Sequence, residues 1–144
     1  MLTIRRLSVE EADVLVYGAR DKSNEIGIPM CIAVSDESGN LIQFERMDGG
    51  KISSISIAID KAFTAAVARK GTHVYNGLCV PGEPTFGIHI SNGGHFCVIG
   101  GGLPVYMDGE IVGGIGISSG TAAEDLVVAE GAIEHYEAWR AGRS

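Results

Sequence analysis

Glycine constrains the fold of this chain more than any other feature of its sequence. It accounts for 21 of the 144 residues, and fourteen of these lie between Gly71 and Gly120. An average protein contains about 7% glycine, and the excess matters because glycine adopts positive φ angles and lets the backbone approach a ligand or another backbone closely. We therefore expect the unusual geometry, and with it the functional site, in the second half of the chain, although tight turns account for at least half of these glycines.

Three segments show helical patterns. Ser8-Val-Glu-Glu11 is a capping box, and apolar residues follow it at helical spacing as far as Gly27. Residues 53–70 carry the clearest apolar stripe, and their many alanines favour close packing against a sheet. A second capping box, Thr121-Ala-Ala-Glu124, begins a final helix.

Two hairpins are predicted between these helices. Residues 30–35 and 41–47 flank a turn, and both faces of the first strand are apolar or small, which indicates that it is covered on both sides. Residues 103–107 and 110–117 flank Asp108-Gly109, a dipeptide typical of a tight hairpin turn.

A further strand is expected at Phe96–Ile99, and the segment before it is irregular. Between Gly71 and Gly94, prolines and glycines break every pattern apart from one short helix expected at Thr72–Leu78. Irregular segments of this length tend to be functional. The pattern predicts one domain over residues 1–144, of the α+β type, with about five antiparallel strands covered by helices.

The charge of the chain excludes several classes of partner. Eleven basic and eighteen acidic residues give a net charge of −7, which argues against nucleic acid and anionic membranes. The chain has neither a membrane-spanning apolar run nor a signal-type start, so we expect a cytoplasmic protein. Its three cysteines, which lack CxxC spacing, are expected to be reduced thiols.

Three blocks of sequence resemble the GlcG/HbpS family, which includes the C-terminal domain of PduO-type proteins. The blocks are Ile32-Ala-Val-Ser-Asp36 with Gly39-Asn-Leu41 and Arg46-Met-Asp48-Gly49; Ile57-Ala58 with Lys61-Ala62 and Thr64-Ala65; and Gly101-Gly102-Leu-Pro104-Val with Gly109-Glu-Ile-Val-Gly113-Gly-Ile-Gly116-Ile-Ser118, Asp125 and Ala129. Only Gly71–His95 matches poorly. The resemblance implies an α/β/α sandwich with a five-stranded antiparallel sheet and a homo-oligomer. It also implies a link to haem or corrinoids in some members, while others lie in small-acid catabolism.

The poorly matched segment contains three candidate catalytic residues. His89 and His95 lie six residues apart around two glycines, and imidazoles bind metals and transfer protons near neutral pH. Glu83 lies between two prolines that fix its backbone, which suits a catalytic base. Two ordinary loop histidines and a plain turn explain the same pattern equally well.

Three basic residues are candidates for binding an acidic ligand. Lys61 corresponds to the family's central-helix lysine, and its alternative role is a structural salt bridge with Asp36 or Asp48. Arg46 has the planar fork that recognises carboxylates, unless it is only a surface charge. His73 either lines a pocket with Lys61 or stabilises the carboxyl end of the central helix.

Other sites are excluded by their context. Gly100-Gly101-Gly102 precedes a strand rather than a helix, so it is no phosphate loop. No third ligand accompanies the histidines at a zinc-type spacing, so no metal site is predicted.

Three functions stay open. The first is a ligand-binding protein of the GlcG/HbpS type that takes haem or another tetrapyrrole. The second is an enzyme of small organic-acid catabolism, an isomerase, tautomerase, hydratase or lyase that uses the histidines and Glu83. The third is an accessory subunit whose glycine-rich surfaces only assemble a ring.

Overall fold

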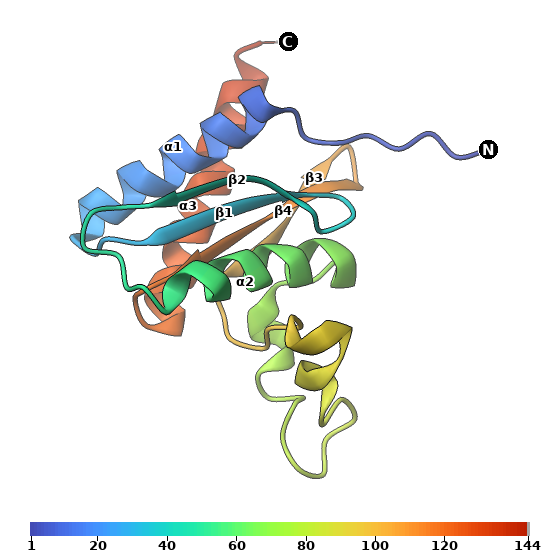
Figure 1. Ribbon diagram of the computed structural model, residues 1–144. Helices are drawn as coiled ribbons and strands as arrows, with labels where there is room; N and C mark the ends of the chain where they lie inside the picture. Colours follow the sequence, from blue (N-terminus) through green and yellow to red (C-terminus); the bar gives the residue numbers. More distant parts are fainter. Residues whose placement is uncertain (144) are drawn as a thin grey trace.

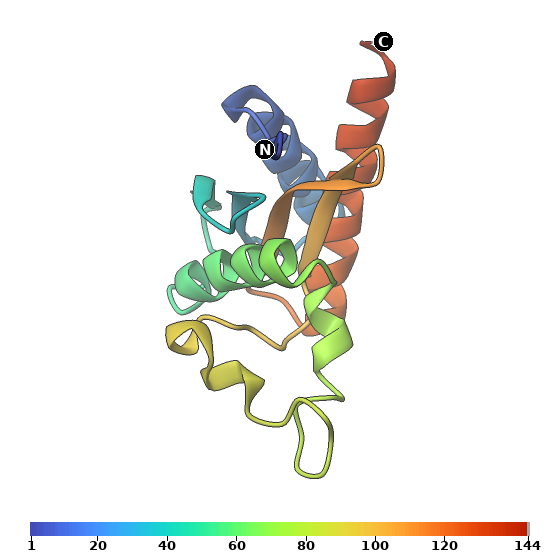
Figure 2. The same cartoon turned by 90° about the vertical axis from the view of Figure 1, so that its right-hand side faces the viewer.

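Four strands form a single antiparallel sheet in the order β2-β1-β4-β3 in the computed structural model, which describes residues 1–143 (Figure 1). The strands are β1 (Cys31–Asp36), β2 (Leu41–Arg46), β3 (Gly102–Met107) and β4 (Glu110–Ser118), and the helices are α1 (Val9–Ile26), α2 (Ser54–Ala68) and α3 (Ala122–Ala141). Figures 1 and 2 show α1 and α3 together on one face of the sheet and α2 on the other. The expected α+β architecture of helices around an antiparallel sheet is confirmed.

Local sequence signals set most helix ends. Both capping boxes form: Ser8 and Glu11 exchange hydrogen bonds at the start of α1, and Thr121 and Glu124 do so at the start of α3. Gly27 ends α1 with a φ of 75°. The central helix α2 is shorter than predicted, because Arg69 takes a left-handed conformation with a φ of 59°.

Strand β1 is buried along its whole length, as the apolar character of both its faces predicts. Ile32 and Val34 join the core beneath α1 and α3, whereas Cys31 and Ala33 pack with Ala58 and other residues on the α2 side. Because successive side chains of a strand point to opposite faces, β1 contributes to two separate cores.

Helix α2 lies against the backbone of β4. A Cβ atom built on Gly114 or Gly116 would collide with backbone atoms of α2, at Ala62 for Gly114 and at Ala58 and Ala62 for Gly116. The facing residues of the helix are therefore small, and the helix axis approaches the sheet more closely than larger side chains would allow. This close approach fixes the position of every other residue on α2.

The prediction of a fifth strand at Phe96–Ile99 is wrong, since the described chain contains four strands and these residues are irregular. The amide of Cys97 donates to the Thr64 hydroxyl on α2 (2.8 Å) rather than to a neighbouring strand. Only from Gly101, whose carbonyl accepts from the amide of Ile117 (2.9 Å), does the chain run beside β4. The Thr64 hydroxyl of α2 thus takes backbone partners that a fifth strand would need.

Residues Thr72–Ile99 form a lobe that projects beyond α2, away from the sheet (Figures 1 and 2). It holds three single turns of 3-10 helix: η1 (Thr72–Tyr75), η2 (Ile88–Ile90) and η3 (Asn92–Gly94). The short helix expected at Thr72–Leu78 is therefore present only as η1. The Thr72 hydroxyl closes the base of the lobe, because it donates to the carbonyl of Ile99 (2.6 Å) and accepts from the amide of Gly102 (2.9 Å).

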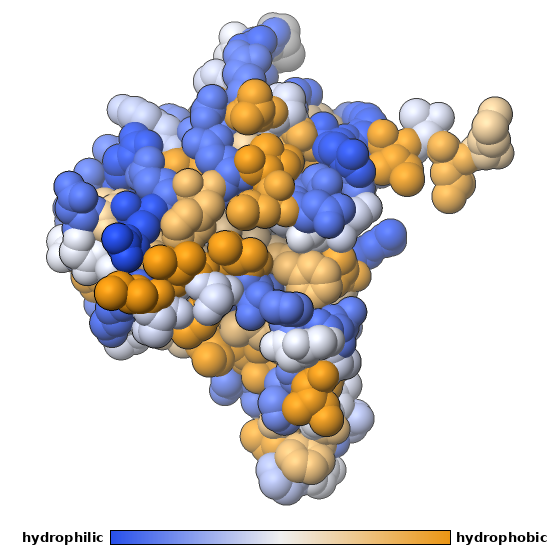
Figure 3. Space-filling model, in the orientation of Figure 1, coloured by the Kyte–Doolittle hydropathy of each residue, from blue (hydrophilic) through white to orange (hydrophobic). Residues whose placement is uncertain are grey.

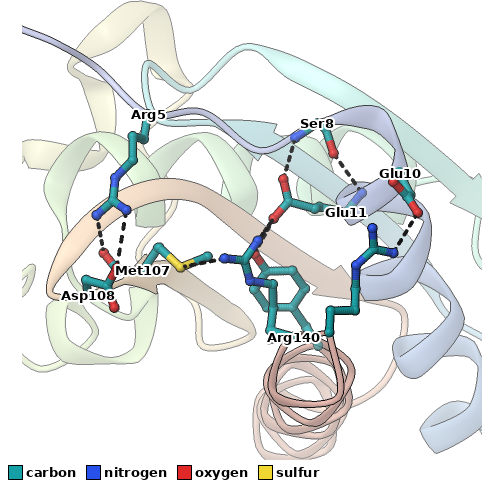
Figure 4. A network of polar contacts seen from close by, with 9 residues as sticks. Arg5, Ser8, Glu10, Glu11, Met107, Asp108 and Arg140 are labelled. Carbon is teal, nitrogen blue, oxygen red and sulfur yellow. Dashed lines mark hydrogen bonds and ion pairs between the residues drawn. The ribbon is translucent and has the colours of Figure 1, made fainter.

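A polar network joins the two helices of the other face (Figure 4). Glu11 of α1 accepts from the Tyr136 hydroxyl (2.6 Å) and from Arg140 (3.2 Å), both on α3. Arg5 contacts Asp108 in the β3–β4 turn (3.3 Å). Among residues 1–143, no helix is both long and apolar enough to cross a membrane.

Candidate functional site

His95 is held on two sides by neighbouring turns of α2. Its Nδ1 atom lies 2.9 Å from the Asp60 carboxylate, and its carbonyl accepts from the Thr64 hydroxyl at 3.2 Å. Asp60 and Thr64 lie four residues apart, and residues at this spacing share one face of a helix. One stripe of α2 therefore fixes both the backbone and the ring of His95.

The next residue anchors His95 to the core. Phe96 is buried and meets the ring of Tyr75 edge-on, with a centroid separation of 5.0 Å. The amide of Cys97 beyond it also bonds to Thr64. His95 thus sits at the point where the lobe returns to α2, and Thr64 holds the main chain on both sides of Phe96.

The contact with Asp60 decides which nitrogen of His95 carries the hydrogen. A carboxylate only accepts hydrogen bonds, so Nδ1 donates, and in the neutral imidazole Nε2 then keeps its lone pair. The side chain of His95 is 65% exposed. An imidazole oriented by a carboxylate, with the other nitrogen accessible, is the arrangement that metal-binding histidines adopt.

The lobe that carries this histidine also exposes apolar side chains. Phe86 and Ile90 are 60% and 73% exposed, and Val74, Val80 and Ile99 are also largely open to solvent. The space-filling view shows apolar side chains at the surface of the lobe (Figure 3). Large apolar side chains that gather on one exposed segment point to an interaction site.

His89 and Glu83 have other surroundings. His89 is exposed, and its Nδ1 atom lies 3.1 Å from the Cys79 sulfur, although η2 and η3 place it in the same lobe as His95. Glu83 is exposed, and its carboxylate makes no hydrogen bond or ion pair within residues 1–143. The hydrogen bonds and ion pairs of the described residues thus do not connect the three candidate catalytic residues in one site, and their surroundings differ. Their catalytic roles stay predictions.

Lys61 is buried, with 1% of its surface exposed, and it is fully engaged. Its ammonium group donates to the Asp125 carboxylate and to the Ile117 carbonyl, each at 2.8 Å. The salt bridge expected with Asp36 or Asp48 is thus made with Asp125 of α3 instead. Burial raises the pKa of the Asp125 carboxyl, and the bond to Lys61 opposes that shift.

Arg46 and His73 line two separate cavities. Arg46 is exposed beside a cavity of about 650 Å³ between the end of α1 and β2, which Asn24 and Asp48 also line. His73 lines a cavity of about 240 Å³ with Gly100 and the first turn of α3. Their ligand-binding roles stay predictions, and Lys61 lines neither cavity.

Asp60 and Thr64 are the site residues that sequence reasoning missed. Their four-residue spacing on a confidently helical segment was visible, but nothing in the sequence indicated which distant residue they would meet. Within residues 1–143, no three His, Cys, Asp or Glu side chains are grouped so as to hold a metal ion alone.

Comparison with known proteins identifies the family. Residues 7–134 match the model described as "Haem degrading protein HbpS-like". The chain belongs to the HbpS-like family. The resemblance inferred from its three sequence blocks is thereby confirmed.

Three proteins similar to this HbpS-like chain match it along most of their length. An uncharacterized 15.0 kDa protein from the dhaT-dhaS intergenic region of Citrobacter freundii is 33% identical over 133 residues, which is 92% of this chain and 94% of the relative. The crystal structure of Klebsiella pneumoniae ORFY has a TM-score of 0.93 and 28% identity, covering 96% of this chain and 95% of that one. A PduOC structure described as a haem complex has a TM-score of 0.86 and 28% identity, covering 90% and 94%.

Proposed function

We propose that this protein binds haem, which His95 would hold through Nε2 and which the apolar surface of the lobe would contact. The observation that carries the proposal is the 2.9 Å contact between His95 and Asp60, which leaves Nε2 to bind a metal. The family and the haem complex of PduOC support it.

The residues present fit the group. Haem needs a nitrogen or sulfur ligand and an apolar surface, and the lobe carries both the oriented imidazole of His95 and exposed apolar side chains such as Phe86 and Ile90. Lys61 is buried against Asp125 and therefore does not hold a propionate. When bound, haem would supply an iron centre whose reactivity depends on its axial ligand.

The chain's own residues prepare this ligand. Asp60 holds the proton on Nδ1 and fixes the orientation of the imidazole, as carboxylate partners do for metal-binding histidines. Thr64 fixes the main chain on either side of Phe96, so the ring loses little freedom on binding. A small acidic ligand other than haem would contact the same His95 imidazole.

Haem titration followed by absorbance tests the proposal. We expect wild-type protein to develop a Soret band, His95→Ala to lose it, and His89→Ala to keep it. Asp60→Asn should weaken binding by about tenfold, since loss of an outer-shell partner typically has this effect. Equal affinity of wild type and His95→Ala would overturn the proposal.

We also propose that the protein assembles as a homo-oligomer through the edge strand β2 and the adjoining face of α2. Leu41 of β2, Val67 of α2 and Ile52 just before α2 are exposed apolar residues, and the outer edge of β2 pairs with no strand among residues 1–143. Sedimentation at micromolar concentration tests this, and a 15.1 kDa species would contradict it.

Proton-transfer catalysis by Glu83 gains no support from the contacts. Its carboxylate is at the tip of an exposed turn and meets neither His89 nor His95 within the described residues.

A further inference from the structure

A cysteine and a histidine of the lobe form a close pair that the proposed haem site does not use. The Cys79 sulfur lies 3.1 Å from Nδ1 of His89, within hydrogen-bonding distance for sulfur. Cys79 is half-buried and His89 is exposed. A thiol in contact with an imidazole is the arrangement that activates a cysteine nucleophile.

The loop between the two residues is closed by a second set of contacts. Thr85 bonds to the carbonyl of Leu78 through both its hydroxyl (2.8 Å) and its amide (3.2 Å). This closure brings the chain back beside Cys79. Gly87, with a φ of 90°, then starts the turn η2 that carries His89. The backbone of the loop thus brings Cys79 and His89 together.

The other two cysteines have different surroundings. Cys31 is buried in the sheet and contacts the carbonyl of Lys51, and burial raises the pKa of its thiol. Burial also raises the pKa of the Cys97 thiol, whose sulfur makes no hydrogen bond to a histidine within residues 1–143. A raised pKa disfavours the thiolate, the reactive form of cysteine. The chain therefore contains its own reference thiols.

We propose that Cys79 is a nucleophilic thiol, with His89 as its base, that forms a mixed disulfide with low-molecular-weight disulfides. His89 takes the thiol proton, and the Cys79 sulfur attacks one sulfur of the disulfide. A new S–S bond forms as the old one breaks, and the electron pair leaves with the second sulfur, which is released as a thiolate and takes up a proton. The Cys79 sulfur is oxidised and the small disulfide is reduced.

Two observations favour disulfide exchange over acyl transfer. The amide of Cys79 already donates to the carbonyl of Tyr75 (2.9 Å), so it is not free to stabilise an oxyanion. His89 is exposed and Cys79 is half-exposed, and exchange requires only an in-line approach to the sulfur. Neither observation involves His95, so the inference stands or falls separately from haem binding.

Reaction of the haem-free, full-length protein with oxidised glutathione tests the proposal. Peptide mapping by mass spectrometry follows the adduct on each cysteine at neutral pH. We expect Cys79 to react about tenfold or more faster than Cys97 and Cys31. His89→Ala should slow Cys79 by about tenfold, and added imidazole should restore part of the rate by replacing the lost base.

Two controls separate base catalysis from a change of fold. His135→Gln alters a histidine of α3 that packs against Tyr17, and it should leave the Cys79 rate unchanged. In denaturant the three cysteines should react at similar rates with or without His89. Equal rates for Cys79 and Cys97 in folded protein, or an unaltered Cys79 rate in His89→Ala, would overturn the proposal.

Discussion

Two regions of the molecule are rich in glycine but use it for opposite purposes. One is the contact between α2 and the sheet, and the other is the lobe at Thr72–Ile99. Gly114 and Gly116 lie where a Cβ atom would strike the backbone of α2. Gly82, Gly87 and Gly94 have φ angles of +90°, +90° and +84°, and a Cβ atom on any of them would meet nothing within 4 Å. Glycine permits close packing in the first region and sharp turns in the second, so the first is rigid framework and the second carries the exposed groups.

The largest expected effect concerns the framework. Lys61→Met removes the partner of Asp125 and leaves a buried carboxylate without its ion pair, so it should lower the free energy of unfolding by about 3–5 kcal/mol. Urea denaturation measures the loss. The double variant Lys61→Met/Asp125→Leu should recover much of it, and a single variant as stable as wild type would show that the pair does not hold α2 to α3.

Two glycine substitutions compare the regions directly. Gly116→Ala forces α2 away from the sheet and should cost about 3 kcal/mol, at the upper end of the usual range for overpacking. Gly82→Ala has free space and only the strain of a positive φ, so it should cost about 1 kcal/mol. Thermal unfolding of both variants gives the order, and a reversed order would contradict the division into framework and lobe.

Thr64 is where the two regions meet. Thr64→Val keeps the shape of the side chain but leaves the amide of Cys97 without its acceptor, a loss of about 1–3 kcal/mol for a buried group. We expect faster hydrogen exchange in the lobe and little change in β1 and β4. Uniform exchange throughout the molecule would mean that the lobe is part of the same cooperative unit.

The smallest expected effect is a pH dependence of stability that arises from an ion pair between α1 and β2. Arg20 on α1 donates two hydrogen bonds to Glu45 on β2, each 2.7 Å, and this lowers the Glu45 pKa. The carboxylate therefore stabilises the fold above its unfolded pKa of about 4.3, and the gain is lost as the pH falls through the lower, folded value. Because both side chains are partly exposed, Arg20→Met should cost less than about 1 kcal/mol at pH 7. The difference between variant and wild type should shrink below about pH 4.

Sequence reasoning succeeded where a local pattern determines structure. Capping boxes, the Asp108-Gly109 turn and the two apolar faces of β1 are each read within a few residues, and the structure agrees with them. It failed at Phe96–Ile99, because the apolar run suits a strand but the Thr64 hydroxyl, far away in sequence, takes its backbone donor. The partner of Lys61 was missed for the same reason. Asp125 is 64 residues away and becomes a neighbour only once the sheet has formed.

Candidate site residues depend even more on distant contacts. The histidines could be selected from the sequence because imidazole chemistry is distinctive. Their separate partners, Asp60 for His95 and Cys79 for His89, follow from how the lobe folds back onto α2. Nothing in the local sequence distinguishes the two.

The closure of the lobe at Thr72 affects how this protein tolerates insertions and deletions. The Thr72 hydroxyl, at the start of the lobe, bonds to the carbonyl of Ile99 at its end and to the amide of Gly102 just beyond. These bonds hold the two ends of the lobe together independently of the chain between them. The entropy of closing a flexible loop rises only with the logarithm of its length, by about 0.6 kcal/mol for each doubling. The segment between these ends can therefore change in length and sequence at little thermodynamic cost, while the register of β3 against β4 is kept.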